Sequence, residues 1–188
     1  MVKTMVMTLP RSFALLFSLL ALPAVGCGPT TPTPNNPNDA SGDKHPLVGQ
    51  RAPDFTLETL NGQGKVSLAS LKGKVVIVDF WATWCEPCKK SFPKLQELNV
   101  KYKASGMEIV AISTDETTTG VAEFGKSHGA VKFPIVHDPE GKVVAKKWSP
   151  PTMPSSFVVD KKGIVRFVHV GYHDKDEVKI EQEVKSLL

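Results

Sequence analysis

The sequence predicts an α/β domain with a mixed central β-sheet flanked by helices. The apolar run at residues 75–80 has the composition of a strand covered on both faces. An amphipathic stretch over residues 85–105 separates it from a second apolar run at residues 107–113, and a strand–helix–strand connection of this kind makes the two strands parallel. Further strands at residues 156–160 and 164–170 flank a Lys-Lys-Gly turn and form an antiparallel hairpin.

The segments around this centre complete the predicted domain, residues 46–188. Residues 47–57 form a lead-in and an edge strand, and a turn at Asn61-Gly62 precedes a short strand at residues 66–68, which makes an N-terminal β-hairpin extension. A helix over residues 118–128 and a strand over residues 133–137 form a helix–strand insertion. A short helix at residues 143–148 and a terminal amphipathic helix at residues 174–188 follow.

The first 26 residues have the pattern of an export signal. Lys3 and Arg11 supply positive charge, and the apolar core at residues 13–22 is shorter than the roughly 20 residues that span a bilayer. The segment ends in Ala24-Val25-Gly26-Cys27, which resembles a bacterial lipoprotein signal. That resemblance implies that Cys27 becomes the lipidated N-terminus. An ordinary secretory signal with a free Cys27, or an uncleaved anchor, remains the alternative.

Residues 27–45 are predicted to join the lipid to the domain as a disordered tether. Their Pro, Thr and Asn content leaves almost no apolar side chain to bury, so folding cannot offset the ordering entropy. The whole chain of 188 residues has a formal net charge of +4 with dispersed lysines. This charge pattern does not indicate a nucleic-acid partner.

Cys85 and Cys88 follow the buried strand and begin the predicted helix. A helix N-terminus stabilises an anion and therefore favours a thiolate. We expect Cys85 to be the nucleophile and Cys88, one turn further on, to be the resolving thiol of a dithiol/disulfide exchange enzyme. A structural zinc site would need four ligands, and no second cysteine pair exists. We therefore expect neither a metal nor another cofactor.

Three neighbours of the pair are predicted to tune its chemistry. Pro87 suits the first helical turn, and a carboxylate at Glu86 opposes a neighbouring thiolate and raises the thiol pKa. A solvated Glu86 with no such effect is the alternative. Asp79 lies on the apolar strand, where an unpaired carboxylate is costly, so we expect it to accept a proton from Cys88. A structural partner for Asp79 is the competing interpretation.

The stretch from Asp79 to Cys88 resembles the active-site segment of the thioredoxin fold. The Gly-Gln-x-Ala-Pro-Asp-Phe pattern within residues 47–57, with the insertion described above, is similar to the TlpA/ResA-like exported thiol-disulfide oxidoreductases. The resemblance implies a thioredoxin fold, a membrane-anchored domain outside the cytoplasm and a reducing role toward cysteine-containing proteins such as apocytochromes. A membrane electron donor must then reduce the pair. One departure is Ser91, because the ResA branch carries Glu there.

The resemblance also implies a substrate-binding surface. In thioredoxin folds the proline at the position of Pro154 is cis and lies against the two cysteines, so the backbone of Met153 is presented to an extended substrate. Trp84 is expected to add an exposed apolar contact surface, whereas Trp81 is expected in the core. An ordinary proline turn at Pro154 is the alternative.

Two other functions compete with disulfide exchange. The Ala-Pro-Asp-Phe motif is shared with peroxiredoxins, but those enzymes place Thr three residues before the reactive cysteine, where this chain has Ala82. A copper metallochaperone of the Sco type uses a cysteine pair with a distant histidine, here His128 or His137, but with three residues between the cysteines instead of two. The sequence leaves open the direction of electron flow, the client, the membrane that holds the anchor and the oligomeric state.

Overall fold

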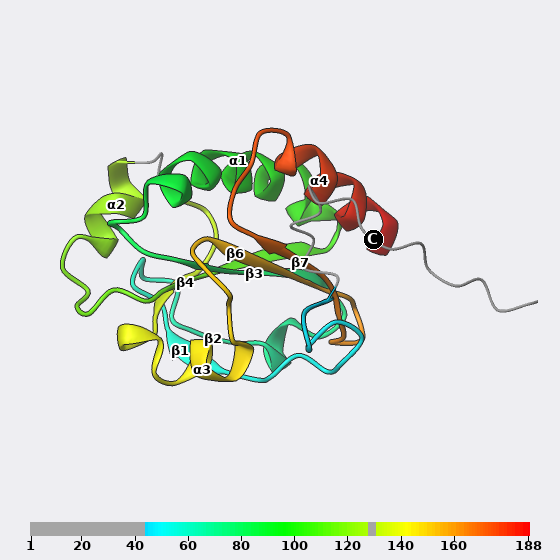
Figure 1. Ribbon diagram of the computed structural model, residues 1–188, viewed down its shortest axis with the longest axis horizontal. Helices are drawn as coiled ribbons and strands as arrows, with labels where there is room; N and C mark the ends of the chain where they lie inside the picture. The colour runs from blue at the N-terminus through cyan, green and yellow to red at the C-terminus, as the bar shows by residue number, and fades with distance from the viewer. Residues whose placement is uncertain (1–43, 128–130) are drawn as a thin grey trace, which may run out of the picture. The chain divides into compact units, whose positions relative to one another are not determined.

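The computed structural model describes residues 44–127 and 131–188. Its centre is a five-stranded sheet in the order β5-β4-β3-β6-β7 (Figure 1). The sheet strands are β3 (Val75–Trp81), β4 (Met107–Ser113), β5 (Ile135–His137), β6 (Ser155–Val159) and β7 (Val165–Val170). A separate two-stranded sheet pairs β1 (Thr56–Glu58) with β2 (Lys65–Ser67). The helices are α1 (Glu86–Tyr102), α2 (Val121–Ser127), α3 (Val144–Trp148) and α4 (Asp176–Leu187), with 3-10 turns η2 (Ala69–Leu71), η3 (Lys103–Ser105) and η4 (Pro139–Gly141).

Strand β3 runs parallel to β4 and antiparallel to β6, which confirms the predicted mixed sheet. Asp79 lies opposite Ala111 on β4 and opposite Ser156 on β6. On the next strand pair, Ser156 lies opposite His169 of β7. Because successive side chains along a strand alternate between faces and directly paired residues share a face, this register places Asp79, Ser156 and His169 on one face of the sheet.

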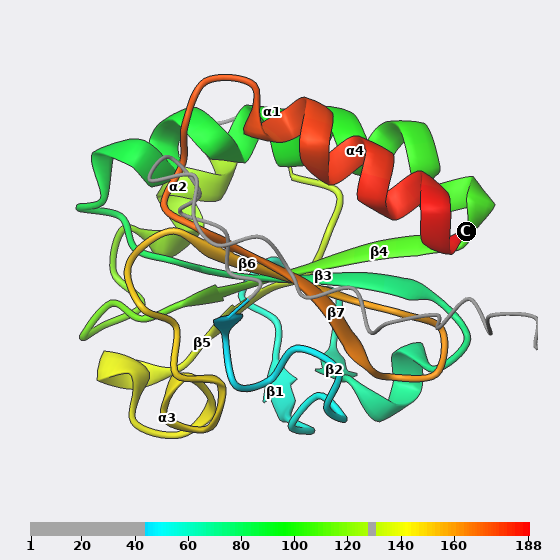
Figure 2. The same cartoon turned by 45° about the vertical axis from the view of Figure 1, so that its right-hand side comes forward.

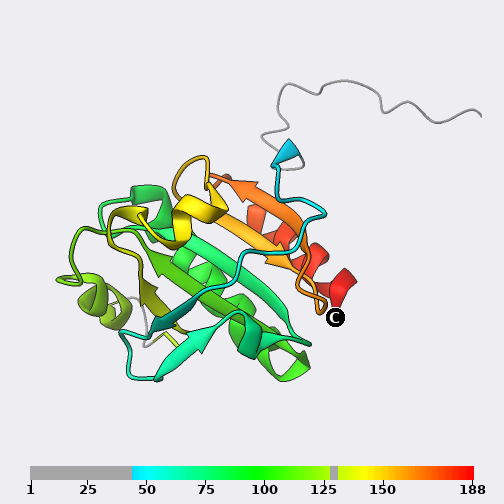
Figure 3. The same cartoon turned by 90° about the horizontal axis from the view of Figure 1, so that it is seen from below.

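Helices cover that face, and the β1–β2 hairpin with α3 covers the other (Figures 2 and 3). Helices α1 and α4 lie side by side above the sheet, and their side chains at Phe92, Ile180 and Val184 pack with Ile77 of β3. The opposite core joins Val78 and Phe80 to the hairpin and α3. Two apolar layers therefore enclose β3, whose seven residues are all buried.

The structure sets the bounds of two predicted elements. Within the predicted lead-in and edge strand of residues 47–57, the regular strand β1 begins only at Thr56, because the backbone before it bonds elsewhere. Gly49 donates to the carbonyl of Val165, the first residue of β7, and Ala52 donates to that of Gly163, just before the strand. Helix α2 begins at Val121 instead of residue 118, and the predicted end of that helix at His128 lies outside the described residues.

The predicted signal and nearly all of the predicted tether, residues 1–43, also lie outside the part of the chain that the structure describes. Within residues 44–127 and 131–188, no helix is both long enough and apolar enough to cross a membrane.

Candidate active site

The two cysteines form a disulfide at the N-terminus of α1, with their Cα atoms 5.3 Å apart. Cys85 has an extended backbone and caps the helix, and its Sγ accepts the backbone N–H of Cys88 at 3.2 Å. Pro87 lies in the first turn, where a missing N–H costs no helical hydrogen bond. Unpaired helical N–H groups and the helix dipole at this end favour negative charge on the Cys85 sulfur once the disulfide is reduced.

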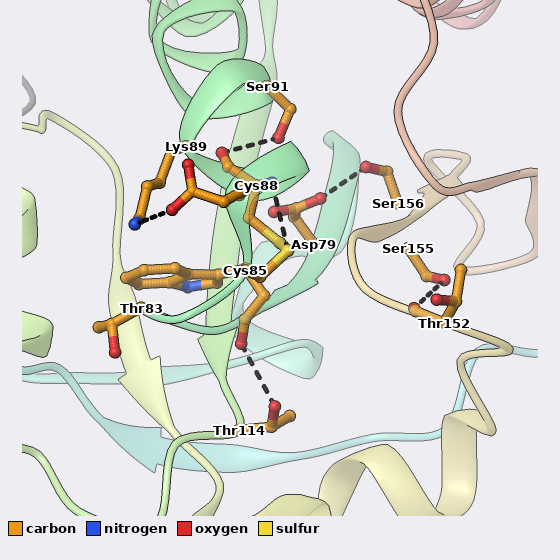
Figure 4. Close-up of a disulfide and its surroundings, with 12 residues drawn as sticks. Asp79, Thr83, Cys85, Cys88, Lys89, Ser91, Thr114, Thr152, Ser155 and Ser156 are labelled. Atoms are coloured by element: carbon orange, nitrogen blue, oxygen red, sulfur yellow. Dashed lines mark hydrogen bonds and ion pairs between the residues drawn. A yellow bond between two sulfur atoms is a disulfide. The ribbon is translucent and has the colours of Figure 1, made fainter.

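Asp79 lies beside the disulfide and is fully buried (Figure 4). Ser156 Oγ donates a hydrogen bond to Asp79 Oδ1 at 2.6 Å. Asp79 Oδ2 receives no hydrogen bond from any residue that the structure describes. Burial raises the pKa of Asp79 from 3.8 to about 7, against the opposing effect of the Ser156 hydrogen bond. The carboxyl can therefore hold or release a proton near neutral pH.

The surface around the pair is shaped by Trp84 and a cis-proline loop. Trp84 is 69% exposed next to Cys85, whereas Trp81 is fully buried against Phe92. The Met153–Pro154 peptide bond is cis. Thr152 precedes this bond, and its carbonyl accepts the Ser155 hydroxyl at 2.7 Å. Both cysteines are buried, and the exposed Trp84 next to Cys85 is the apolar side chain that a partner protein can contact.

Glu86 is exposed, and Lys89 pairs with it one turn further along α1. The hydrogen bond and charge of Lys89 lower the pKa of Glu86, so the carboxylate is ionised at neutral pH. The same lysine places positive charge beside that carboxylate. The predicted opposition between Glu86 and a Cys85 thiolate is therefore partly compensated by Lys89.

Ser91 is buried on α1, and its hydroxyl donates to the Cys88 carbonyl at 3.1 Å. The position that carries Glu in the ResA branch thus holds a small, neutral side chain turned back onto its own helix.

Sequence reasoning missed Asp115, a buried carboxylate just after β4. It accepts hydrogen bonds from the Thr83 hydroxyl at 2.7 Å, the Thr83 backbone N–H at 3.1 Å and the Ser113 hydroxyl at 2.7 Å. Asp115 therefore holds the loop that carries Trp84 and Cys85. Its position at the carboxyl end of a predicted parallel strand, beside the end of β3, was the available signal.

The other predicted positions contribute less to this constellation. Cys27 lies outside the described residues, as does His128. His137 bonds the Asp115 carbonyl through Nε2 at 2.7 Å. Across the described ranges, no three or more His, Cys, Asp and Glu side chains are grouped so that they could hold a metal ion.

A disulfide at the N-terminus of α1, after the central strand β3, together with a cis Met153–Pro154 bond before β6, is the arrangement of a thioredoxin-fold thiol-disulfide oxidoreductase. Comparison with known proteins agrees. Residues 48–168 match the model of the AhpC/TSA family. The chain is 39% identical over 132 residues to the thiol-disulfide oxidoreductase ResA of Bacillus thuringiensis strain Al Hakam, covering 70% of this chain and 75% of ResA. It is 43% identical over 124 residues to the ResA of Bacillus subtilis strain 168, covering 65% and 67%.

Solved structures show the same relationship. A Chlorobium tepidum protein described as the thiol:disulfide interchange protein DsbE superposes with a TM-score of 0.70 at 36% identity, covering 74% of this chain and 96% of that one. A thioredoxin-family thiol:disulfide interchange protein from Chlorobium tepidum TLS gives 0.64 at 29% identity, covering 73% and 94%. The chain belongs to the AhpC/TSA family and is a TlpA/ResA-like thiol-disulfide oxidoreductase.

Proposed function

We propose that this protein is an exported, membrane-anchored reductase that passes electrons from Cys85 and Cys88 to disulfides of other exported proteins. The observation that carries the proposal is the disulfide itself. It lies at a helix N-terminus, beside an exposed Trp84 and against the buried carboxyl of Asp79.

The chemistry follows from these positions. In the reduced protein, the Cys85 thiolate attacks a client disulfide, forms a mixed disulfide and releases one client thiolate. Asp79 accepts the proton of Cys88, and the Cys88 thiolate then attacks the Cys85 sulfur. The second client sulfur leaves as a thiolate and takes up a proton. The client gains two electrons, and the Cys85–Cys88 pair is oxidised to the disulfide.

The export signal and Cys27 support the anchored location. A lipidated Cys27 followed by a long polar tether would hold the domain near a membrane outside the cytoplasm, where a membrane electron donor would return it to the dithiol. Trp84, Met153 and Pro154 would contact the client, and Glu86 with Pro87 would tune the pair. Because Ser91 replaces the Glu of the ResA branch, the proposal covers cysteine-containing clients in general, with apocytochromes as one case.

Exchange is better supported than peroxide reduction. Ala82 occupies the position at which peroxiredoxins place Thr, and the nearby Thr83 hydroxyl is already bonded to Asp115. Peroxide turnover by the purified protein, at a rate comparable with disulfide exchange, would reverse this preference.

The proposal is tested by trapping clients in the cell envelope. Cys88→Ser leaves Cys85 able to attack a client but removes the thiol that displaces the client, so mixed disulfides should accumulate and disappear on treatment with a reductant. Cys85→Ser is the matched control and should trap none. A reduction potential near that of thioredoxin, about −270 mV, supports a reductase, whereas a value near −120 mV contradicts it.

A further inference from the structure

A cavity of about 140 Å³ lies between α1, α4 and the ends of β6 and β7. Ser91, Pro154, Ser156, His169, Tyr172 and Ile180 are among the residues that line it. A single water needs about 10–15 Å³ of such volume, so the cavity has room for several. Asp79 is not among the lining residues. Ser156 connects it to the cavity, because Ser156 lines the cavity and donates a hydrogen bond to the Asp79 carboxyl.

The next polar residue on this face of the sheet is His169. Ser156 is the direct cross-strand partner of His169, which places their Cβ atoms about 4.5–5.5 Å apart on one face. His169 is 8% exposed, and its Nε2 donates to Glu183 Oε2 of α4 at 2.6 Å. With Nε2–H directed at a carboxylate, Nδ1 is the nitrogen that can accept a further proton.

We propose that Ser156, His169 and Glu183 form a proton relay that connects the buried carboxyl of Asp79 with solvent through this cavity. The inference rests on the proposed role of Asp79 as the proton acceptor for Cys88. Asp79 has no exposed surface, so it must release any proton that it holds through a neighbouring group before it can accept the proton of Cys88.

The transfer balances as a series of proton exchanges without redox change. The Ser156 hydroxyl, which donates to Asp79 Oδ1 in the structure, first turns its O–H toward the cavity. The O–H bond of protonated Asp79 then breaks, and its proton moves to Ser156 Oγ. The original Ser156 proton moves, directly or across a cavity water, to Nδ1 of His169. The resulting imidazolium is stabilised by the Glu183 carboxylate and then releases one proton to solvent. Asp79 returns to the carboxylate, and Ser156 and His169 regain their starting protons.

The other charged or titratable groups that line the cavity have partners of their own. From α1, Lys94 pairs with Glu97, and Lys101 pairs with Glu181 of α4. Tyr172 donates to Glu177, and Asp176 accepts the His173 backbone N–H. Each of these groups thus has a hydrogen-bond or ion-pair partner outside the proposed relay. His169 is the titratable residue that lies directly across from Ser156 on the neighbouring strand.

The test follows disulfide closure when the reduced protein reacts with oxidised glutathione, using tryptophan fluorescence from about pH 5 to pH 9. His169→Gln and Ser156→Ala should each slow closure by roughly tenfold or more and change its pH profile. Ser156→Thr keeps the hydroxyl and should recover most of the rate that Ser156→Ala loses. His173→Gln removes an exposed histidine from the neighbouring loop and should change nothing. Added imidazole should restore the rate of His169→Ala.

Three results separate the possibilities. If Asp79→Asn slows closure while His169→Gln and Ser156→Ala do not, the relay is wrong and the role of Asp79 stands. If none of the three changes matters, the proposed role of Asp79 fails as well. If His169→Gln slows closure without altering the pH profile, and imidazole has no effect on His169→Ala, His169 is structural and the relay is wrong. Adding His169→Gln to Asp79→Asn should bring no further loss, because both act on one path.

Discussion

At the scale of single residues, Asp79 is held where burial opposes its charge. Among the described residues, Ser156 is its one hydrogen-bond donor, and the side chain has no exposed surface. Burial raises its pKa from 3.8 to about 7. Between these two values the folded protein keeps a proton that the unfolded chain releases. The free energy of unfolding therefore falls as the pH rises through this interval and is lowest above it.

Asp79→Asn removes this titration. Because each pKa unit corresponds to about 1.4 kcal/mol, the variant should gain up to roughly 4 kcal/mol relative to wild type as the pH rises from about 4 to 8. Urea unfolding of both oxidised proteins at the two pH values measures the difference, with Asp174→Asn on the surface as the control. A wild-type-to-variant difference that does not change with pH would contradict the assignment.

Trp84 is predicted to serve protein clients and not the thiol chemistry itself. Its side chain is 69% exposed beside Cys85, so it contributes little to the core. Trp84→Ala should slow reduction of a protein disulfide by roughly tenfold, the effect of losing about 1.4 kcal/mol of contact, while the reaction with a small disulfide stays within about twofold. Stopped-flow rates with both substrates decide this, and equal losses would show that Trp84 acts on the cysteines.

At the scale of elements, α3 shows how a short helix is held in place. Five residues are too few to form a stable helix alone. The fully buried Asp138 accepts N–H groups from Val143, Val144 and Ala145 at 2.9, 2.8 and 2.7 Å. Trp148 then packs against Phe80 and Phe157. A carboxylate thus fixes the helix start, and an aromatic residue fixes its end.

Asp138→Ala leaves three N–H groups without their acceptor and should lower the free energy of unfolding by roughly 3 kcal/mol. Asp138→Asn keeps one acceptor oxygen and should cost less. Glu140→Ala, on an exposed side chain of the same turn, provides the control. Urea denaturation measures all three, and an Asp138→Ala effect below about 0.5 kcal/mol would show that packing alone holds α3.

At the scale of the whole molecule, the proposed anchor decides where the redox site works. Cys27→Ala should move the protein from the membrane fraction to the soluble fraction and abolish incorporation of a metabolic lipid label. Cys88→Ser keeps Cys27 and should remain in the membrane fraction. Equal labelling of wild type and Cys27→Ala would refute lipidation at this residue.

Much of the fold was predictable because its signals are local. The apolar runs of β3 and β4, the amphipathic α1 between them and the Lys-Lys-Gly turn each occur within a few residues. The pairing of the lead-in before β1 was not predictable, because Gly49 and Ala52 use their N–H groups on carbonyls more than a hundred residues away in the sequence. No local pattern contains that information.

The sequence by itself determined that this chain is a disulfide-exchange protein, because Cys85, Cys88 and the strand and helix on either side of them are contiguous. Only the tertiary structure decided what surrounds the pair. Ser156, His169 and Asp115 reach the site through strand register and through loops that meet at the end of the sheet. Segments that are distant in the sequence meet around β3, because this strand is buried between two apolar layers. The same burial raises the pKa of Asp79.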